Sequence, residues 1–149
     1  MTQRKDTLEM VREFHEKFSL PILDQGSMPS DDRKLLRLEL LYEELNELEN
    51  GLNLKNYDCD QDIVAVLDAL CDLQYVLDGA FLELGLHGLK NNAMAEVHRS
   101  NMSKLGANGK PIYSKTGKVL KGPNYTPPDL VGICRNAGIL KEEKSECAA

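Results

Sequence analysis

Apolar side chains recur at helical spacing in four stretches of the chain. The periodicity predicts helices over residues 7–18, 32–50, about 60–84 and 89–105. Pro21 follows the first helix, and Gly51, Gly85 and Gly106 follow the other three, as is typical of helix ends. The third stretch is apolar on nearly every side from residue 63 onward, and a helix of that kind is expected at the centre of a fold.

The chain changes character after the fourth predicted helix. Glycines and prolines become frequent, and two short runs, residues 111–114 and 118–121, flank a turn at Gly117 and can pair as a small hairpin. We expect residues 141–149 to form a frayed or disordered end of the chain. Strands do not alternate with helices and no glycine-rich phosphate loop occurs, which excludes Rossmann and P-loop folds.

The composition is that of one globular domain. Of the 149 residues, 42% are apolar and 28% are charged, and no apolar run approaches the roughly 20 residues that span a bilayer. The start lacks a secretory signal, and the four cysteines form no Cys-x-x-Cys pair. We therefore expect one all-α domain over residues 1–149, cytoplasmic and without a membrane partner. Its predicted architecture is a four-helix bundle with a basic extension at residues 106–130.

Charge is distributed unevenly along the sequence. The net charge is −6, which argues against nucleic acid as the main partner, but residues 97–128 hold six Lys or Arg and no acid. That stretch carries +6, so the rest carries −12. An acidic part and a basic part in one chain suit a site for an anion and its metal ion. A basic tail on an acidic helical domain would give the same distribution.

Two groups of acids lie on the apolar helices. Glu43, Glu44 and Glu47 fall within an arc of about 100° that reaches the apolar stripe of the second helix. Asp68 and Asp72 are four residues apart and share a face of the third. Carboxylates partly removed from water require salt bridges, shared protons or a divalent cation, and few bases occur in these helices. Oxygen ligands without nearby His or Cys favour Mg²⁺ or Mn²⁺, and a structural polar network is the alternative.

The pattern Glu43-Glu44-Leu-Asn-Glu47, followed about 20 residues later by Asp68-Ala-Leu-Cys-Asp72, resembles the all-α nucleoside triphosphate pyrophosphohydrolases, the MazG-like and phosphoribosyl-ATP pyrophosphohydrolase-like superfamily. The segments Ser-Asn-Met-Ser-Lys104 and Lys121-Gly-Pro-Asn-Tyr resemble the phage and bacterial branch of these proteins. Where many relatives place Glu three residues before the last Asp, this chain has Ala69.

The resemblance implies a role for each acid and for part of the basic stretch. Glu44, Glu47, Asp68 and Asp72 would bind Mg²⁺ or, in its place, Mn²⁺, and Glu43 would bind a further ion or orient the attacking water. Candidate contacts of the phosphates are Arg99, Asn101, Lys104, Lys118 and Lys121. The activity implied is hydrolysis of a nucleoside triphosphate to monophosphate and pyrophosphate, and the family also implies a homodimer or a dimer of dimers.

Two other functions remain open from the sequence. One is the same chemistry on phosphoribosyl-ATP. The other is a catalytically silent helical oligomer that uses residues 97–128 as a basic arm for nucleic acid. The preferred base and sugar do not follow from the sequence, because the shape of the pocket determines them.

Overall fold

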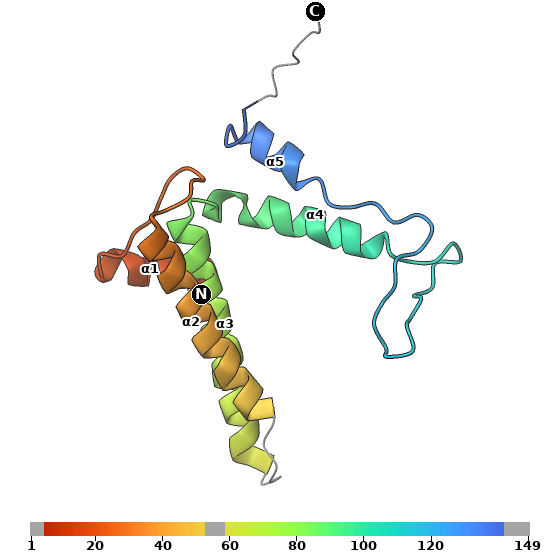
Figure 1. Ribbon diagram of the computed structural model, residues 1–149, viewed down its shortest axis with the longest axis horizontal. Helices are drawn as coiled ribbons and strands as arrows, with labels where there is room; N and C mark the ends of the chain where they lie inside the picture. The colour runs from red at the N-terminus through yellow and green to blue at the C-terminus, as the bar shows by residue number, and fades with distance from the viewer. Residues whose placement is uncertain (1–4, 53–58, 142–149) are drawn as a thin grey trace, which may run out of the picture. The chain divides into compact units, whose positions relative to one another are not determined.

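The computed structural model describes residues 5–52 and 59–141 (Figure 1). Within these residues it contains five α-helices and one short 3₁₀ turn, and it contains no strand, which confirms the all-α class. The chain divides into two compact units, the first ending at His87 and the second starting at Gly88. Each unit is described by itself, and the single domain expected from the sequence stays a prediction. None of the described helices is both long and apolar enough to span a membrane.

The first unit begins with α1 (Thr7–Lys17), whose ends follow from local sequence. Asp6 and Glu9 form a capping box, in which the Asp6 carboxylate accepts from the Glu9 N–H at 2.8 Å and the Glu9 carboxylate accepts from the Asp6 N–H at 3.1 Å. The helix ends before Ser19, which has a left-handed φ of 54°, and the Leu20 N–H donates to the His15 carbonyl at 2.8 Å. The predicted bounds are confirmed to within one residue.

Two long antiparallel helices, α2 (Asp31–Leu52) and α3 (Cys59–Glu83), lie side by side and form the body of this unit (Figure 1). Contacts between Gly51 and Val66 at one end and between Arg33 and Glu83 at the other fix their direction. α1 packs on the second half of α3. After α3 the chain turns at Gly85, where φ is +64° and an added Cβ would lie 2.1 Å from the Gln25 carbonyl oxygen, so a side chain is excluded there.

The core of the first unit is small. Val11, Ala69 and Leu82 are its buried apolar side chains among the described residues. The expectation that α3 is covered on all sides is wrong for the single chain, because α1 and α2 leave part of it open. Ile63 and Val64, in the first turns of α3, are each 63% exposed. An extended apolar face therefore remains on α3.

The second unit contains α4 (Lys90–Met102), a long loop and α5 (Leu130–Asn136), and the 3₁₀ turn η1 (His87–Leu89) precedes α4. The two predicted short runs are joined by one isolated antiparallel bridge, Tyr113 to Val119, with the Leu120 N–H donating to the Ile112 carbonyl at 2.8 Å. This is an isolated bridge and not a pair of strands, so a hairpin is not confirmed.

The four-helix bundle is likewise not confirmed. α1, α2 and α3 belong to the first unit, whereas α4 belongs to the second and contacts α5 there. Helix α5 has no counterpart in the sequence prediction. It begins after Asp129, whose carboxylate accepts from the Gly132 N–H at 2.8 Å.

Candidate functional site

The predicted acids lie on facing stretches of α2 and α3. Glu44 of α2 is half-buried, and its pKa is raised above the ordinary 4.5. Desolvation by burial is the largest cause, and the negative charges of Asp72, Glu47, Glu43 and Asp68 follow in that order. The same four carboxylates that the sequence grouped with Glu44 are thus close enough to act on it. The structure therefore brings all five predicted acids into one cluster, which we call the acid cluster.

The acid cluster is open to solvent apart from Glu44. Glu43, Glu47, Asp68 and Asp72 are exposed in the single chain, so the expected burial of the two aspartates is wrong. Ala69, which stands where many relatives have Glu, is 2% exposed and belongs to the core. Among the described residues no Lys or Arg forms an ion pair with the five acids. Within the described part of the chain, no basic side chain compensates their mutual repulsion.

The chemistry of this donor set fits a hard divalent cation, since every candidate ligand is a carboxylate oxygen. The side chains are not arranged as a finished chelate: in the described part of the chain no three His, Cys, Asp or Glu side chains converge closely enough to hold one ion. Ligation would therefore require rotation of exposed carboxylates. Such rotation is inexpensive for side chains that have no protein partner.

A second polar group lies about two to three helical turns from the acid cluster on the same two helices. Glu83 of α3 is 1% exposed and is paired with two arginines of α2: Arg33 by two hydrogen bonds, and Arg37 at 2.9 Å. Burial lowers the pKa of the Arg37 guanidinium, and the Glu83 carboxylate opposes this shift. The Arg37 Nε is buried and has no hydrogen-bond partner. Such an atom invites a ligand or a water.

His15 of α1 completes this second group. It is 2% exposed, and its Nδ1 lies 3.0 Å from the Pro21 carbonyl oxygen. Because a carbonyl only accepts, Nδ1 must carry the proton, so the Nε2 of the neutral ring is an acceptor. Nε2 and Arg37 Nη1 both face Gly79 of α3: an added Cβ would lie 3.1 Å and 2.7 Å from them. An acceptor and a donor are thus presented side by side over a bare stretch of helix.

A cavity of about 330 Å³ opens at this place. Its polar lining comprises His15, Arg33 and Arg37. Its apolar lining comprises Val11, Phe14, Leu20, Leu36, Leu40, Tyr75 and Val76. Leu40 precedes Glu44 by one turn and Val76 follows Asp72 by one turn, so the cavity starts about 6 Å along the helices from the acid cluster. We call it the ring cavity, because its walls include the edge-to-face pair Phe14 and Tyr75.

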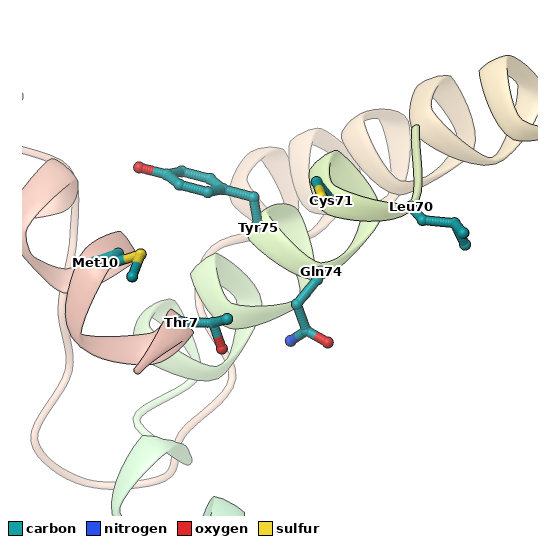
Figure 2. Close-up of a pocket in the computed structure, with 6 residues that line it drawn as sticks. All are labelled: Thr7, Met10, Leu70, Cys71, Gln74 and Tyr75. Atoms are coloured by element: carbon teal, nitrogen blue, oxygen red, sulfur yellow. The ribbon is translucent and has the colours of Figure 1, made fainter. Parts of the chain in front are cut away.

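A different cavity, of about 320 Å³, lies between α1 and the middle of α3 (Figure 2). Thr7 and Met10 line it from α1, and Leu70, Cys71, Gln74 and Tyr75 line it from α3. Its surface is almost entirely apolar, and the Gln74 amide donates to Asp78 at 3.0 Å. No charged side chain lines it, so it offers nothing that would orient a phosphate or a metal ion.

The predicted phosphate contacts all lie in the second unit, and the structure separates them by their partners. The Asn101 side-chain oxygen accepts from Lys104 Nζ at 2.7 Å. Lys121 Nζ lies 4.3 Å above the Tyr125 ring, and Lys118 is exposed at the bridge. Arg99 differs, because its guanidinium is engaged by Glu96, Thr126 and Pro127. It is therefore the least available of the five to a ligand.

Sequence reasoning missed the polar group of His15, Arg33, Arg37 and Glu83. Its partners are up to 50 residues apart, so no local motif unites them. The available signals were Arg33 and Arg37 four residues apart, hence on one face of α2, and Gly79 inside an apolar helix. A glycine in that position indicates that another group approaches the helix closely.

Comparisons with known proteins identify the family of this chain. A model of the phosphoribosyl-ATP pyrophosphohydrolase family matches residues 11–101, a span that includes the entire acid cluster. A crystal structure of a candidate NTP pyrophosphohydrolase from Exiguobacterium sp. 255-15 is 25% identical in sequence. The similarity covers 90% of this chain and 96% of that one, with a TM-score of 0.47. Among curated proteins no significant sequence match was found. Because the family model covers more than half of the chain, this protein belongs to the phosphoribosyl-ATP pyrophosphohydrolase family, within the MazG-like NTP pyrophosphohydrolase superfamily.

Proposed function

We propose that the protein is a Mg²⁺-dependent pyrophosphohydrolase that cleaves the α–β bond of a nucleoside or deoxynucleoside triphosphate, releasing the monophosphate and pyrophosphate. One observation carries the proposal: burial and then four neighbouring carboxylates raise the pKa of Glu44, and none of the five acids has a basic partner among the described residues. A cluster with uncompensated negative charge, in a chain of this family, suits a site that works by binding cations.

The acid cluster supplies the ligands in this proposal. Glu44, Glu47, Asp68 and Asp72 would hold Mg²⁺, with Mn²⁺ as a substitute, and Glu43 would accept a hydrogen bond from the attacking water or bind a further ion. The bound cation supplies charge neutralisation and a more acidic water. The protein's own task is positioning, because a triphosphate gains little from covalent help. Asn101, Lys104, Lys118 and Lys121 remain proposed contacts of the phosphates.

The ring cavity is the proposed binding site of the nucleoside. It lies about one helical turn from the acid cluster, which is the distance over which a nucleoside connects its base to its first phosphate. Phe14 and Tyr75 offer aromatic walls to a base. The acceptor at His15 Nε2 and the donor at Arg37 match the edge of a base, on which a donor and an acceptor also stand side by side.

Substitution of Gly79 tests whether the nucleoside binds in the ring cavity. In Gly79→Ala the new Cβ would lie 2.7 Å from Arg37 Nη1 and 3.1 Å from His15 Nε2, so the two groups would have to move apart. We expect KM to rise roughly tenfold with a smaller change in kcat, because the substitution disturbs binding of the base and no proposed metal ligand. Steady-state kinetics measures both values. Ala80→Gly, at the next position on α3, is the matched control. An unchanged KM in Gly79→Ala would contradict the proposal that the nucleoside binds in this cavity.

The raised pKa of Glu44 predicts a link between protons and metal. A carboxyl group with a raised pKa holds its proton to a higher pH, and a cation must displace that proton. We therefore expect Mg²⁺ binding to release protons at acidic pH, over a range that extends above that of an ordinary glutamate, and to release none near pH 8. Calorimetry in two buffers of different ionisation enthalpy measures this release. In Asp72→Asn the release should shift to lower pH, since one of the charges that raises the pKa of Glu44 is gone.

The nature of the products decides between the proposed reaction and its rivals. Incubation with a panel of canonical and modified triphosphates and Mg²⁺ should yield pyrophosphate and a monophosphate, whereas a general phosphatase would yield orthophosphate and a diphosphate. Turnover of phosphoribosyl-ATP and of no other substrate would favour the alternative function, which is the same chemistry on phosphoribosyl-ATP. Absence of turnover together with salt-sensitive binding of DNA or RNA would favour a catalytically silent protein that binds nucleic acid through its basic residues 97–128.

We also propose that the protein works as a homodimer or a dimer of dimers. The support is the apolar face of the first unit, where Leu38, Leu45, Leu67 and Leu70 are each about half exposed or more. A monomer would leave this face in water at a cost of roughly 25 cal/mol per Å². Sedimentation at micromolar concentration should show a species of at least twice 16.7 kDa. A 16.7 kDa species alone would contradict this prediction.

A further inference from the structure

An eight-residue segment of the second unit, residues 122–129, lies along α4 and is fastened to it by side chains. We call this segment the strap. Arg99 of α4 donates from Nη1 to the Thr126 hydroxyl at 2.6 Å and from Nη2 to the Pro127 carbonyl at 3.0 Å. Glu96, one turn earlier, accepts from the Asp129 N–H at 2.8 Å. The two side chains thus hold the second half of the strap.

Glu96 and Arg99 also hold each other. Arg99 Nε and Nη2 donate to the two Glu96 oxygens at 2.8 and 2.7 Å, in the bidentate geometry that gives the strongest such pairs. Four of the five N–H groups of Arg99 are therefore engaged within the protein. The Arg99 hydrogen bonds and the Asp129 N–H lower the pKa of Glu96 to about 2. The pair therefore stays charged throughout the physiological range of pH.

Further contacts fix the register of the strap on α4. Ser100, which is 3% exposed, donates to the Thr126 carbonyl at 2.9 Å, and the Thr126 N–H donates to the Ser103 hydroxyl at 2.9 Å. At the start of the strap the Gly122 N–H donates to the Lys104 carbonyl at 2.9 Å. An added Cβ on Gly122 would lie 2.2 Å from the Leu105 carbonyl oxygen, so the backbones are in close contact.

This docking determines where two lysines stand. Lys121 directly precedes the strap, and the N–H of its neighbour Gly122 donates a hydrogen bond to the Lys104 carbonyl. The backbone hydrogen bond holds the chain that carries Lys121 beside the end of α4, where Lys104 follows the helix. The hydrogen bonds of the strap keep these two segments in register. Both lysines therefore start from one place on the second unit, and we expect their side chains to reach the charges of one polyphosphate.

We propose that Glu96 and Arg99 are positioning residues, which hold the strap so that Lys104 and Lys121 bind the phosphates of the substrate, and that Arg99 does not itself contact them. The inference rests on the proposed function in so far as the ligand is a polyphosphate. It revises the role that the sequence suggested for Arg99. The charge of Arg99 serves to hold the protein's own chain.

The two roles of Arg99 predict opposite results for Glu96→Ala. If Arg99 bound phosphate, removing its carboxylate partner would free it and strengthen binding. If it positions the strap, Glu96→Ala and Arg99→Ala should each weaken binding of inorganic pyrophosphate, measured by calorimetry, by roughly tenfold. The double variant should be no weaker than either single one, because both remove the same fastening. KM for the triphosphate should rise in parallel while kcat changes less.

Amide hydrogen exchange by NMR supplies a readout independent of activity. The N–H groups of Thr126 and Asp129 should exchange faster in both variants, and in the milder Thr126→Val, which removes only one acceptor. Arg99→Lys should not restore binding, since an ammonium group cannot reach the carboxylate and the strap together. Lys115→Ala, an exposed cation in the same unit, controls for net charge and should leave pyrophosphate binding unchanged.

The outcomes separate this inference from the proposed function. Stronger pyrophosphate binding in Glu96→Ala, unchanged exchange at Thr126 and Asp129, or no pyrophosphate binding by the wild-type protein would each overturn the inference. If the wild-type protein binds pyrophosphate and the variants behave as expected, but no triphosphate is hydrolysed, the inference stands and the proposed function falls.

Discussion

Replacing Glu47 by Gln or Asp72 by Asn should lower kcat/KM by about a thousandfold or more. Each change removes the charge of one proposed ligand at nearly constant volume. A bound cation contributes several kcal/mol of stabilisation to a phosphoryl transition state, and loss of its ligand forfeits a large part of that. Both side chains are exposed, so the fold has little reason to change. Steady-state hydrolysis of the best triphosphate from the substrate panel measures the loss.

Glu39→Gln is the matched control for these variants. Glu39 is also an exposed glutamate of α2 but is not among the groups that raise the pKa of Glu44. Its substitution should leave the rate within about twofold, and circular dichroism should give the same helix content for all three variants. If Glu47→Gln or Asp72→Asn retained a rate near that of the wild type, the assignment of ligands would be wrong.

Removal of divalent cations should abolish turnover, and this is the second large effect that we expect. With excess EDTA the rate should fall below detection, and Mg²⁺ or Mn²⁺ should restore it, because no base among the described residues can replace the cation at the acid cluster. Full activity in EDTA would contradict the proposal.

Thermal stability gives a second measure of the same event. A ligand that binds the folded protein alone raises the melting temperature with its concentration. We expect Mg²⁺ to do so for the wild type, and Asp72→Asn to melt higher than the wild type in EDTA, since one repulsive charge has gone. A melting temperature that does not respond to Mg²⁺ in the wild type would argue for a purely structural network.

Much of the local structure could be predicted from the sequence. The bounds of α1, α2 and α3 lie within about two residues of prediction, because capping residues and glycines mark helix ends locally. The prediction that Gly51 ends the second helix is wrong, since α2 continues through Gly51 to Leu52. α4 ends three residues earlier than predicted, at Met102. The seven residues of α5 were missed, since a helix of two turns offers too few positions for a periodic pattern.

The arrangement of the helices was harder to predict. Apolar periodicity shows that a face is to be covered but not what covers it, so the sequence placed α3 in the centre of one four-helix bundle. The acid cluster was found because its members recur at helical spacing on two neighbouring helices. The pairing of Glu83 with Arg33 was not found, because it joins residues 50 apart and depends on how α2 and α3 meet.

The position of Cys71 gives the protein a natural attachment point for a fluorescent reporter. Its thiol is free and exposed, and it directly precedes Asp72 at the edge of the acid cluster. Once the other three cysteines are replaced by serine, a dye on this thiol would experience any change of charge at the neighbouring carboxylates. Cation binding could then be followed by emission in real time, with no nucleotide in the cuvette.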